Sequence, residues 1–208
     1  MQTPSTLRSR ALAVSRGLTC TALVALAFSA ARAAVLALMK RYCVPGYGYR
    51  LSLLEIQKLA YFLQEAGQPL RLKFEKKNYG PYADELRHVL NIMESHYIRG
   101  YGDGKNSPET PIQLLPQADM AEDIVEADPA MRDRFKRVVN LIEGFETPDG
   151  MELLSTVHWI IKHELNLKHE DVHAVVSQVH KWSERKRQTM PYKYVAVATQ
   201  RLVEAGWI

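Results

Sequence analysis

The sequence predicts a mainly α-helical fold, a compact bundle of six or seven helices with one small two-stranded β-hairpin. Apolar residues recur every three or four positions over long stretches, which is typical of amphipathic helices. Capping residues and prolines stand where these stretches begin, whereas only two short segments suggest strands. Of the 208 residues, 47% are apolar and 24% charged, which is ordinary globular composition and argues against disorder.

In the first half of the chain, the clearest predicted helix follows Ser52. Glu55, three residues later, completes a capping box with Ser52, and the helix is expected to end at Gly67. Residues 70–75 alternate apolar and charged side chains, which predicts a strand that could pair with a second one near residues 112–115. Pro81 is expected near the first position of the next helix.

The second half of the chain predicts four further helices. Asp128-Pro129 and Thr147-Pro148 each provide a cap followed by a proline, so we expect helices to about Phe145 and about Leu165. Residues 169–186 and 192–205 close the chain as two more helices. Acidic residues cluster just before this half, and they are Asp119, Glu122, Asp123, Glu126 and Asp128.

The net charge of +4 is unevenly distributed. Residues 1–54 hold seven basic residues and no acid, so residues 55–208 hold 20 Lys and Arg against 23 Asp and Glu. The body of the protein is therefore mildly acidic, and we expect no direct binding of nucleic acid. Two cysteines, Cys20 and Cys43, are too few for a disulfide framework or a cysteine-rich zinc site.

Residues 1–31 form an atypical leader, and residues 32–208 are expected to form the folded domain. Three interpretations of the leader stay open: a non-native segment left by truncation, a secretory signal, or a peripheral helix. Its apolar run is too short and too interrupted to span a membrane. We expect a helix from about Ala31 to Tyr42, no membrane association, and a cytoplasmic protein.

One motif suggests an enzyme. His169-Glu-Asp-Val-His173 satisfies the H-E-x-x-H pattern, in which two histidines share a helix face and hold zinc while the glutamate acts as general base. Asp171 and the position at a helix start weaken this interpretation, and a third ligand is unassigned. A zinc-dependent hydrolase therefore remains an alternative. No phosphate-binding loop or nucleophile elbow occurs, and we expect no metal and no cofactor.

Several stretches in a fixed order resemble a known family. They are Leu51–Gly67, Leu70–Phe74, Tyr79-Gly-Pro-Tyr82, Leu86–Leu90, His96–Asp103, Trp182–Lys186 and Ala205-Gly-Trp207. Together they resemble the C-terminal domain of DarG-type antitoxins and, more loosely, the Panacea antitoxin domain, in which a helix reading K-L-x-Y precedes a Y-G-P turn. The resemblance covers roughly residues 32–208.

The resemblance implies a function and a partner. DarG-type proteins carry a macrodomain that removes ADP-ribose from DNA and a second domain that binds and blocks DarT, a toxin that ADP-ribosylates DNA. Residues 1–31 cannot hold a macrodomain, so we expect no glycohydrolase activity and no enzyme. The resemblance implies that the chain binds a DarT-type toxin, and imitation of DNA is one way in which it would do so. The remaining alternative is an inert remnant of a truncated macrodomain protein.

Eight residues are candidates for contact with the partner, in three groups. Tyr79 and Tyr82 flank a rigid turn, which suits an interface or a structural staple equally. The acidic residues Asp119, Glu122, Asp123 and Glu126 could imitate phosphates towards a basic toxin, or could be a solvated helix end. Arg185 and Lys186 belong to a cationic segment that suits an acid-binding patch or a helix C-terminus.

Overall fold

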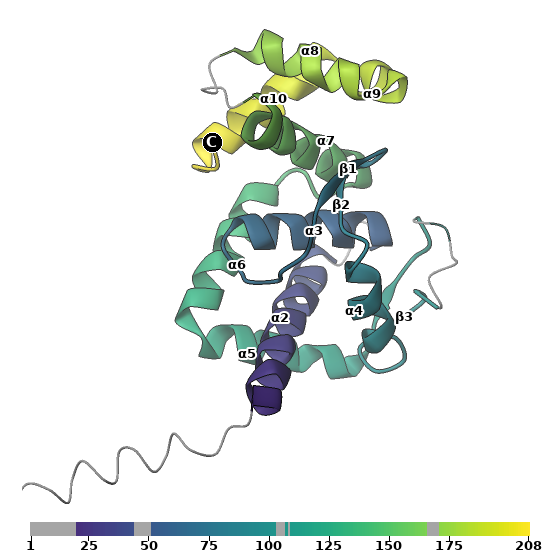
Figure 1. The fold of residues 1–208 in the computed structure, drawn as a ribbon, viewed down its shortest axis with the longest axis vertical. Coiled ribbons are helices and arrows are strands. Elements are labelled where there is room, and N and C mark those ends of the chain that lie inside the picture. The colour runs from purple at the N-terminus through teal and green to yellow at the C-terminus, as the bar shows by residue number, and fades with distance from the viewer. Residues whose placement is uncertain (1–19, 44–50, 103–106, 108, 166–170) are drawn as a thin grey trace, which may run out of the picture.

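The computed structural model describes residues 20–43, 51–102, 107, 109–165 and 171–208, with side chains from residue 30 onward. Within these residues the fold is mainly helical, with nine α-helices and two small antiparallel sheets, so the predicted fold class is confirmed. The helices form two layers (Figure 1): a lower layer around α2 (Cys20–Tyr42) and an upper layer of α7, α8, α9 and α10. None of the described helices combines the length and apolar character that a membrane crossing requires.

The lower layer is built around α2, which runs through its centre (Figure 1). The helix expected from about Ala31 begins at Cys20 instead, and its side chains from Ala33 to Met39 are buried. It packs against α3 (Leu53–Glu65), α5 (Met120–Ala127) and α6 (Pro129–Ile142). Residues 1–19 of the predicted leader lie outside the described residues.

Local signals place α3 and α6 where the sequence predicts them. Ser52 accepts a hydrogen bond from the Leu54 N–H, and the Glu55 carboxylate accepts one from the Ser52 N–H, so the predicted capping box is confirmed. Asp128 caps α6 by accepting from the N–H groups of Ala130 and Met131. Both caps act over three residues, which is why the sequence alone reveals them.

The predicted strand pairing is wrong. Leu72 exchanges two backbone hydrogen bonds with the Gln64 side chain, at 2.8 and 2.9 Å, so this side chain takes the place of a partner strand. Arg71 has a φ of 60°, which interrupts the extended alternation. The strand is instead β1 (Glu75–Lys77), paired with β2 (Gly80–Tyr82), and Pro81 lies in β2 rather than at a helix start.

The second sheet joins loops of the lower layer. Its strands are β3 (Ile98–Arg99) and β4 (Gln113–Leu114), which follow α4 (Leu86–Met93). The short strand predicted near residues 112–115 therefore exists, but it pairs with residues 98–99. A 3-10 turn, η1 (Pro116–Asp119), leads from β4 into α5.

The upper layer begins with α7 (Pro148–Trp159), capped by Thr147 as predicted, and continues as a π-helix, η2 (Ile160–Leu165). The helix expected over residues 169–186 is two helices, α8 (Val172–Trp182) and α9 (Glu184–Thr189), because Ser183 is extended and caps the second one. The last helix is α10 (Tyr192–Glu204). These helices pack on one another, and α7 also packs on α3.

An aromatic cluster joins the two layers. The Tyr61 hydroxyl lies 2.8 Å from Nδ1 of His158, and the rings of Phe62 and Trp207 lie 5.7 and 5.6 Å from the His158 ring. Burial lowers the pKa of His158 from 6.5 to about 3, with smaller contributions from Lys162, His163 and Arg137. This histidine is therefore a neutral core residue.

Candidate functional site

The candidate site lies where α3, the β1–β2 hairpin, α7 and α9 meet (Figure 1). Charged and polar side chains that are almost fully buried gather here, which is uncommon because a charge loses its hydration when it is buried. They are Glu55, Gln57, Lys58, Glu152, Ser155, Thr156 and Lys186.

Two side chains of α3 hold the end of the hairpin. Lys58, which is 1% exposed, donates from Nζ to the Pro81 carbonyl at 2.7 Å. Gln57 pairs with both backbone groups of Ala83 at 2.9 Å. Burial lowers the pKa of Lys58 from 10.5 to about 7, against a raising effect of Glu152. The K-L-x-Y helix and the Y-G-P turn are separate motifs in the sequence, but these hydrogen bonds connect them directly. We call this connection between α3 and the hairpin the joint.

The turn requires a glycine at position 80. Gly80 has a φ of +97°, a region that side chains rarely adopt. A Cβ atom there would lie 3.2 Å from Oγ1 of Thr156 and 3.3 Å from Oγ of Ser155. The hairpin backbone therefore rests directly on the polar face of α7.

Glu152 is the centre of the charged network. Its carboxylate, on α7, accepts hydrogen bonds from Nζ of Lys186 and from the guanidinium of Arg185. Lys186 also donates to Oγ1 of Thr156 at 3.1 Å. Burial lowers the pKa of Lys186, although Glu152 opposes this effect. Both cations come from α9, so Glu152 attaches α9 to α7 through charge-assisted hydrogen bonds.

Cations and aromatic rings cover the network from outside. The Arg185 guanidinium lies 4.7 Å from the centre of the Tyr79 ring, and Lys76 lies 4.3 Å from that of Trp182. The Trp182 indole N–H donates to the Lys77 carbonyl at 3.0 Å. Cation–π contacts and this hydrogen bond therefore hold the hairpin to α8 and α9, and they leave Tyr79 40% exposed.

A pocket of about 250 Å³ opens beside this network. Among the described residues, four carboxylates and one cation, Arg185, line it, so this part of its wall is acidic. The lining residues are Ser52, Leu54, Glu55, Tyr79, Glu109, Pro148, Asp149, Glu152 and Arg185. In the described part of the chain, no group of three or more histidine, cysteine or acidic side chains could hold a metal ion.

The fully buried Glu55 carboxylate is only half satisfied. Its Oε2 atom accepts from the backbone N–H and the hydroxyl of Ser52. Its Oε1 atom has no hydrogen-bond partner among the described residues. A buried carboxylate oxygen without a hydrogen-bond donor lowers the stability of the fold, so a donor from a bound group would be favourable at Glu55.

The predicted partner-binding residues fall at two ends of the molecule (Figure 1). The site brings together Tyr79, Arg185 and Lys186, of which Lys186 is fully buried inside the network. Tyr82 is half-buried, and its hydroxyl accepts from Nε of Arg87 at 3.0 Å. Tyr79 is therefore the more exposed of the two turn tyrosines, and the hydroxyl of Tyr82 is bonded within the chain.

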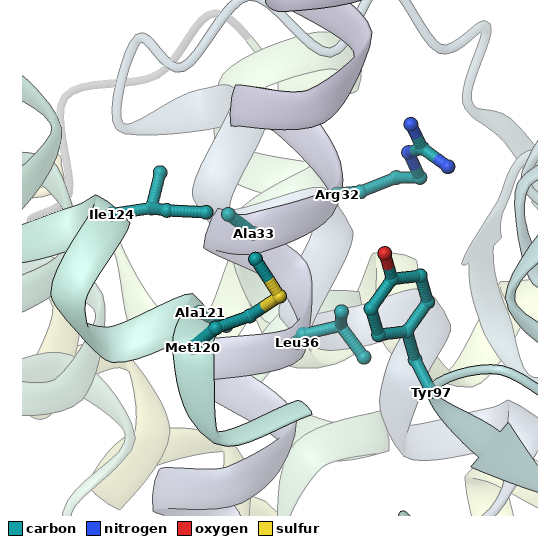
Figure 2. Close-up of a pocket in the computed structure, with 7 residues that line it drawn as sticks. All are labelled: Arg32, Ala33, Leu36, Tyr97, Met120, Ala121 and Ile124. Atoms are coloured by element: carbon teal, nitrogen blue, oxygen red, sulfur yellow. The ribbon is translucent and has the colours of Figure 1, made fainter. Parts of the chain in front are cut away.

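The acidic cluster belongs to the other end, on η1 and α5. Asp119 and Glu122 both pair with Lys40 of α2, at 2.9 and 2.7 Å, and remain 70% and 50% exposed. Asp123 is exposed, and Glu126 lies 3.7 Å from Arg132. A small pocket of about 30 Å³, lined by Tyr97, Met120 and residues of α2 and α5, lies at the same end (Figure 2). It has room for little more than a water molecule.

The structure describes only part of the H-E-x-x-H motif. Its first histidine and glutamate, His169 and Glu170, lie outside the described residues. Asp171 caps α8 by accepting from the Ala174 N–H at 3.0 Å. The rings of His173 and Tyr192 are tilted against each other with centres 4.9 Å apart, and Nε2 of His180 lies 3.0 Å from the Met190 carbonyl.

Sequence reasoning missed Lys58 and Glu152 as members of a site. For Lys58 the signal was present, because Leu54 and Phe62, four positions before and after it, are apolar; Glu152 instead shares a polar face of its helix with Ser155 and Thr156. A charge within the apolar spacing of a helix predicts either a break in the core or a buried partner. The partner of Glu152 comes from residues more than 30 positions away, so no local pattern identifies it.

No protein-family model matches the chain. It is 42% identical over 177 residues to a protein of Thermus aquaticus named DNA ADP-ribosyl glycohydrolase, covering 85% of this chain and 47% of that protein. Proteins of the same name from Mycobacterium bovis and Mycobacterium tuberculosis are each 34% identical over 186 residues, covering 83% of this chain and 52% of theirs. The chain therefore spans about half the length of the curated relatives it matches.

These names agree with the resemblance to DarG-type proteins, and they correct one expectation. The missing macrodomain and the absence of a supported catalytic motif predicted that the chain is not an enzyme. Relatives that are 34–42% identical over most of the chain carry the name of a hydrolase, which contradicts that expectation. A catalytic site assembled from residues distant in sequence leaves no compact motif, so the absence of one was a weak basis for that expectation.

Proposed function

We propose that the chain binds and blocks a DarT-type toxin, a DNA ADP-ribosyltransferase, as part of a toxin–antitoxin pair in the cytoplasm. The observation that carries this proposal is the joint between the two motifs of the resemblance. Lys58 of the K-L-x-Y helix holds Pro81 of the Y-G-P turn, and the turn presents Tyr79 at the surface. The relatives' name refers to ADP-ribosylated DNA, which is the product of such a toxin.

Two surfaces fit a basic, DNA-binding partner. The first is the face formed by Tyr79, Arg185 and the acidic pocket beside them, where a rigid aromatic side chain and buried charges suit a strong contact. The second is the exposed acidic cluster of α5, whose carboxylates could imitate phosphates. Because the first surface is built on the hairpin and α9 and the second on η1 and α5, which are separate elements (Figure 1), mutations separate them.

Titration of the purified chain against a catalytically inactive DarT-type toxin tests the proposal. We expect a one-to-one complex with a Kd of about 1 μM or tighter, and loss of toxin-catalysed DNA modification when the chain is added to active toxin. No binding at concentrations of about 100 μM would overturn it.

Matched variants then locate the contact. Tyr79→Ala removes the exposed ring of the first surface, and the combination Glu122→Gln, Asp123→Asn and Glu126→Gln neutralises the second. Asp133→Asn with Glu143→Gln is the control, because it removes exposed charges of α6 and its C-terminal end, outside both surfaces. Weaker binding in one of the first two variants, but not in the control, assigns the interface.

The relatives' name favours a second candidate function, hydrolysis of ADP-ribose from DNA by this chain. Glycosidic bonds are commonly cleaved by paired carboxylates, and the pocket offers four. Glu109 and Asp149 are the exposed pair, whereas Glu152 is held by two cations.

An ADP-ribosylated oligonucleotide tests this candidate directly. Release of free ADP-ribose by the purified chain, lost in Glu109→Gln with Asp149→Asn and retained in Asp133→Asn with Glu143→Gln, would support hydrolysis in this pocket. Equal release by both double variants would move the reaction elsewhere in the chain. No release from the wild type would overturn the candidate.

A further inference from the structure

We propose that the acidic pocket beside Tyr79 accepts a single cationic side chain, arginine or lysine, from the protein partner. This inference rests on the proposed toxin binding and adds the chemistry of the group that enters.

The charge of the pocket favours a cation. In the part of the chain that the structure describes, four carboxylates and one cation, Arg185, line it. Lys186 lies behind the wall and bonds Glu152 together with Arg185, so these two cations balance that carboxylate. Lys58, further inside, donates to Pro81. Glu55, Glu109 and Asp149 remain without a cation bonded to them among the described residues, which leaves an excess of negative charge.

The oxygen Oε1 of Glu55 independently indicates a donor group. It is buried and lacks a hydrogen-bond partner among the described residues, although its neighbour Oε2 accepts two bonds from Ser52. A ligand that donates several hydrogen bonds would satisfy this oxygen and contact the carboxylates around it. Guanidinium and ammonium groups are side-chain groups that donate without accepting.

The dispersion of the carboxylates favours an organic cation over a metal ion. No three acidic, histidine or cysteine side chains in the described residues converge closely enough to ligate a metal. A planar guanidinium, with five N–H donors, can bridge acceptors that are further apart. Leu54, Pro148 and the Tyr79 ring supply apolar walls against which the aliphatic stem of a long side chain packs.

A pair of small probes tests the pocket without the toxin. N-acetyl-arginine amide and its neutral counterpart N-acetyl-citrulline amide are titrated into the isotope-labelled full chain and followed by NMR. We expect arginine to shift resonances of Tyr79 and Arg185 saturably, with an affinity on the order of 1–10 mM, and citrulline to bind at least about tenfold more weakly. Absence of a saturable shift with arginine, or equal shifts with both probes, would overturn the proposal.

The toxin complex supplies the second arm. Glu109→Gln with Asp149→Asn removes two pocket charges at exposed positions, and Glu55→Gln removes a third while keeping an acceptor for Ser52. We expect each to weaken toxin binding roughly tenfold or more, while Asp133→Asn with Glu143→Gln binds as the wild type does. Urea unfolding of each variant confirms that it is folded.

The outcomes separate the two proposals. Wild-type binding by both pocket variants, in a chain that does bind the toxin, would overturn the pocket assignment and leave the toxin proposal standing. Failure of the wild-type chain to bind the toxin would overturn the proposed function, and the arginine–citrulline comparison would then decide whether the pocket takes a cation.

Discussion

The two ends of the molecule use charge in opposite ways. Around α9 and the hairpin, Glu152 and Lys186 are buried and bonded to each other, and Lys58 lies beside them. Around α5, Lys40 pairs with Asp119 and Glu122 in solvent, over an apolar core made by α2. The charged side chains of the first end are buried, whereas those of the second end are exposed to solvent.

This difference separates the energetic roles of the two sets of ion pairs. Exposed pairs contribute little to stability because water and salt screen them. A buried pair contributes little net stability too, since it has lost its hydration, but removing one partner leaves an uncompensated charge and is strongly destabilising. The hairpin end is therefore sensitive to each of its members, and the α5 end tolerates change.

The largest expected effect comes from Glu152→Ala. The substitution leaves Lys186 buried without its carboxylate, and we expect the free energy of unfolding to fall by about 3–5 kcal/mol, measured by urea denaturation. Glu122→Ala, at the exposed end, is the matched control and should leave the unfolding midpoint unchanged. Equal unfolding midpoints for the two variants would show that the buried and the exposed ion pairs contribute equally to stability.

The pH dependence of stability sharpens the comparison next. Burial lowers the pKa of Lys58 to about 7 in the folded chain, from 10.5, so the unfolded chain binds more protons between these pH values. Stability contributed through Lys58 therefore rises with pH from about 7 to about 10, by on the order of 1–3 kcal/mol.

The variant Lys58→Met isolates this contribution. Unfolding of both proteins in urea at intervals from pH 7 to pH 10 should show a smaller rise for the variant than for the wild type. Parallel curves would mean that the folded and unfolded chains hold the Lys58 proton equally well.

A smaller effect is expected from Gly80→Ala, which tests how tightly the hairpin rests on α7. Gly144 also has a positive φ, +85°, but a Cβ there meets nothing within 4 Å, so Gly144→Ala measures backbone strain alone. We expect Gly80→Ala to cost about 1 kcal/mol more than Gly144→Ala in urea unfolding, because Thr156 and Ser155 must move. An equal loss of unfolding free energy in the two variants would show that Thr156 and Ser155 move aside without a measurable loss of stability.

The smallest expected effect is that of Lys40→Gln. Its ammonium is exposed, although hydrogen bonds to Glu122 and Asp119 raise its pKa. The unfolding midpoint should stay within error of the wild type at 0.15 M salt or above, in the range where exposed pairs are screened. A clear loss of stability would show that the α5 end also depends on its charges.

Local sequence signals determined the helices of this protein. Ser52 with Glu55, Asp128 with Pro129 and Thr147 with Pro148 each mark a helix start, because a cap acts within three or four residues of itself. The mainly helical class followed from these caps and from the spacing of apolar residues. This spacing is also a local signal, because it depends on residues within one or two turns of the same helix. Such signals carry no information about which segments meet.

Tertiary structure alone decided the pairing of strands and the burial of charge. The Gln64 side chain forms hydrogen bonds with both backbone groups of Leu72, so the strand expected there does not pair with residues 112–115. Pro81, expected at a helix start, belongs to strand β2. Lys186, expected at the surface, is enclosed by Glu152 and Thr156 because α9 lies on α7. Both outcomes depend on contacts between residues distant in sequence, and the free energy of such contacts is set only when the segments pack.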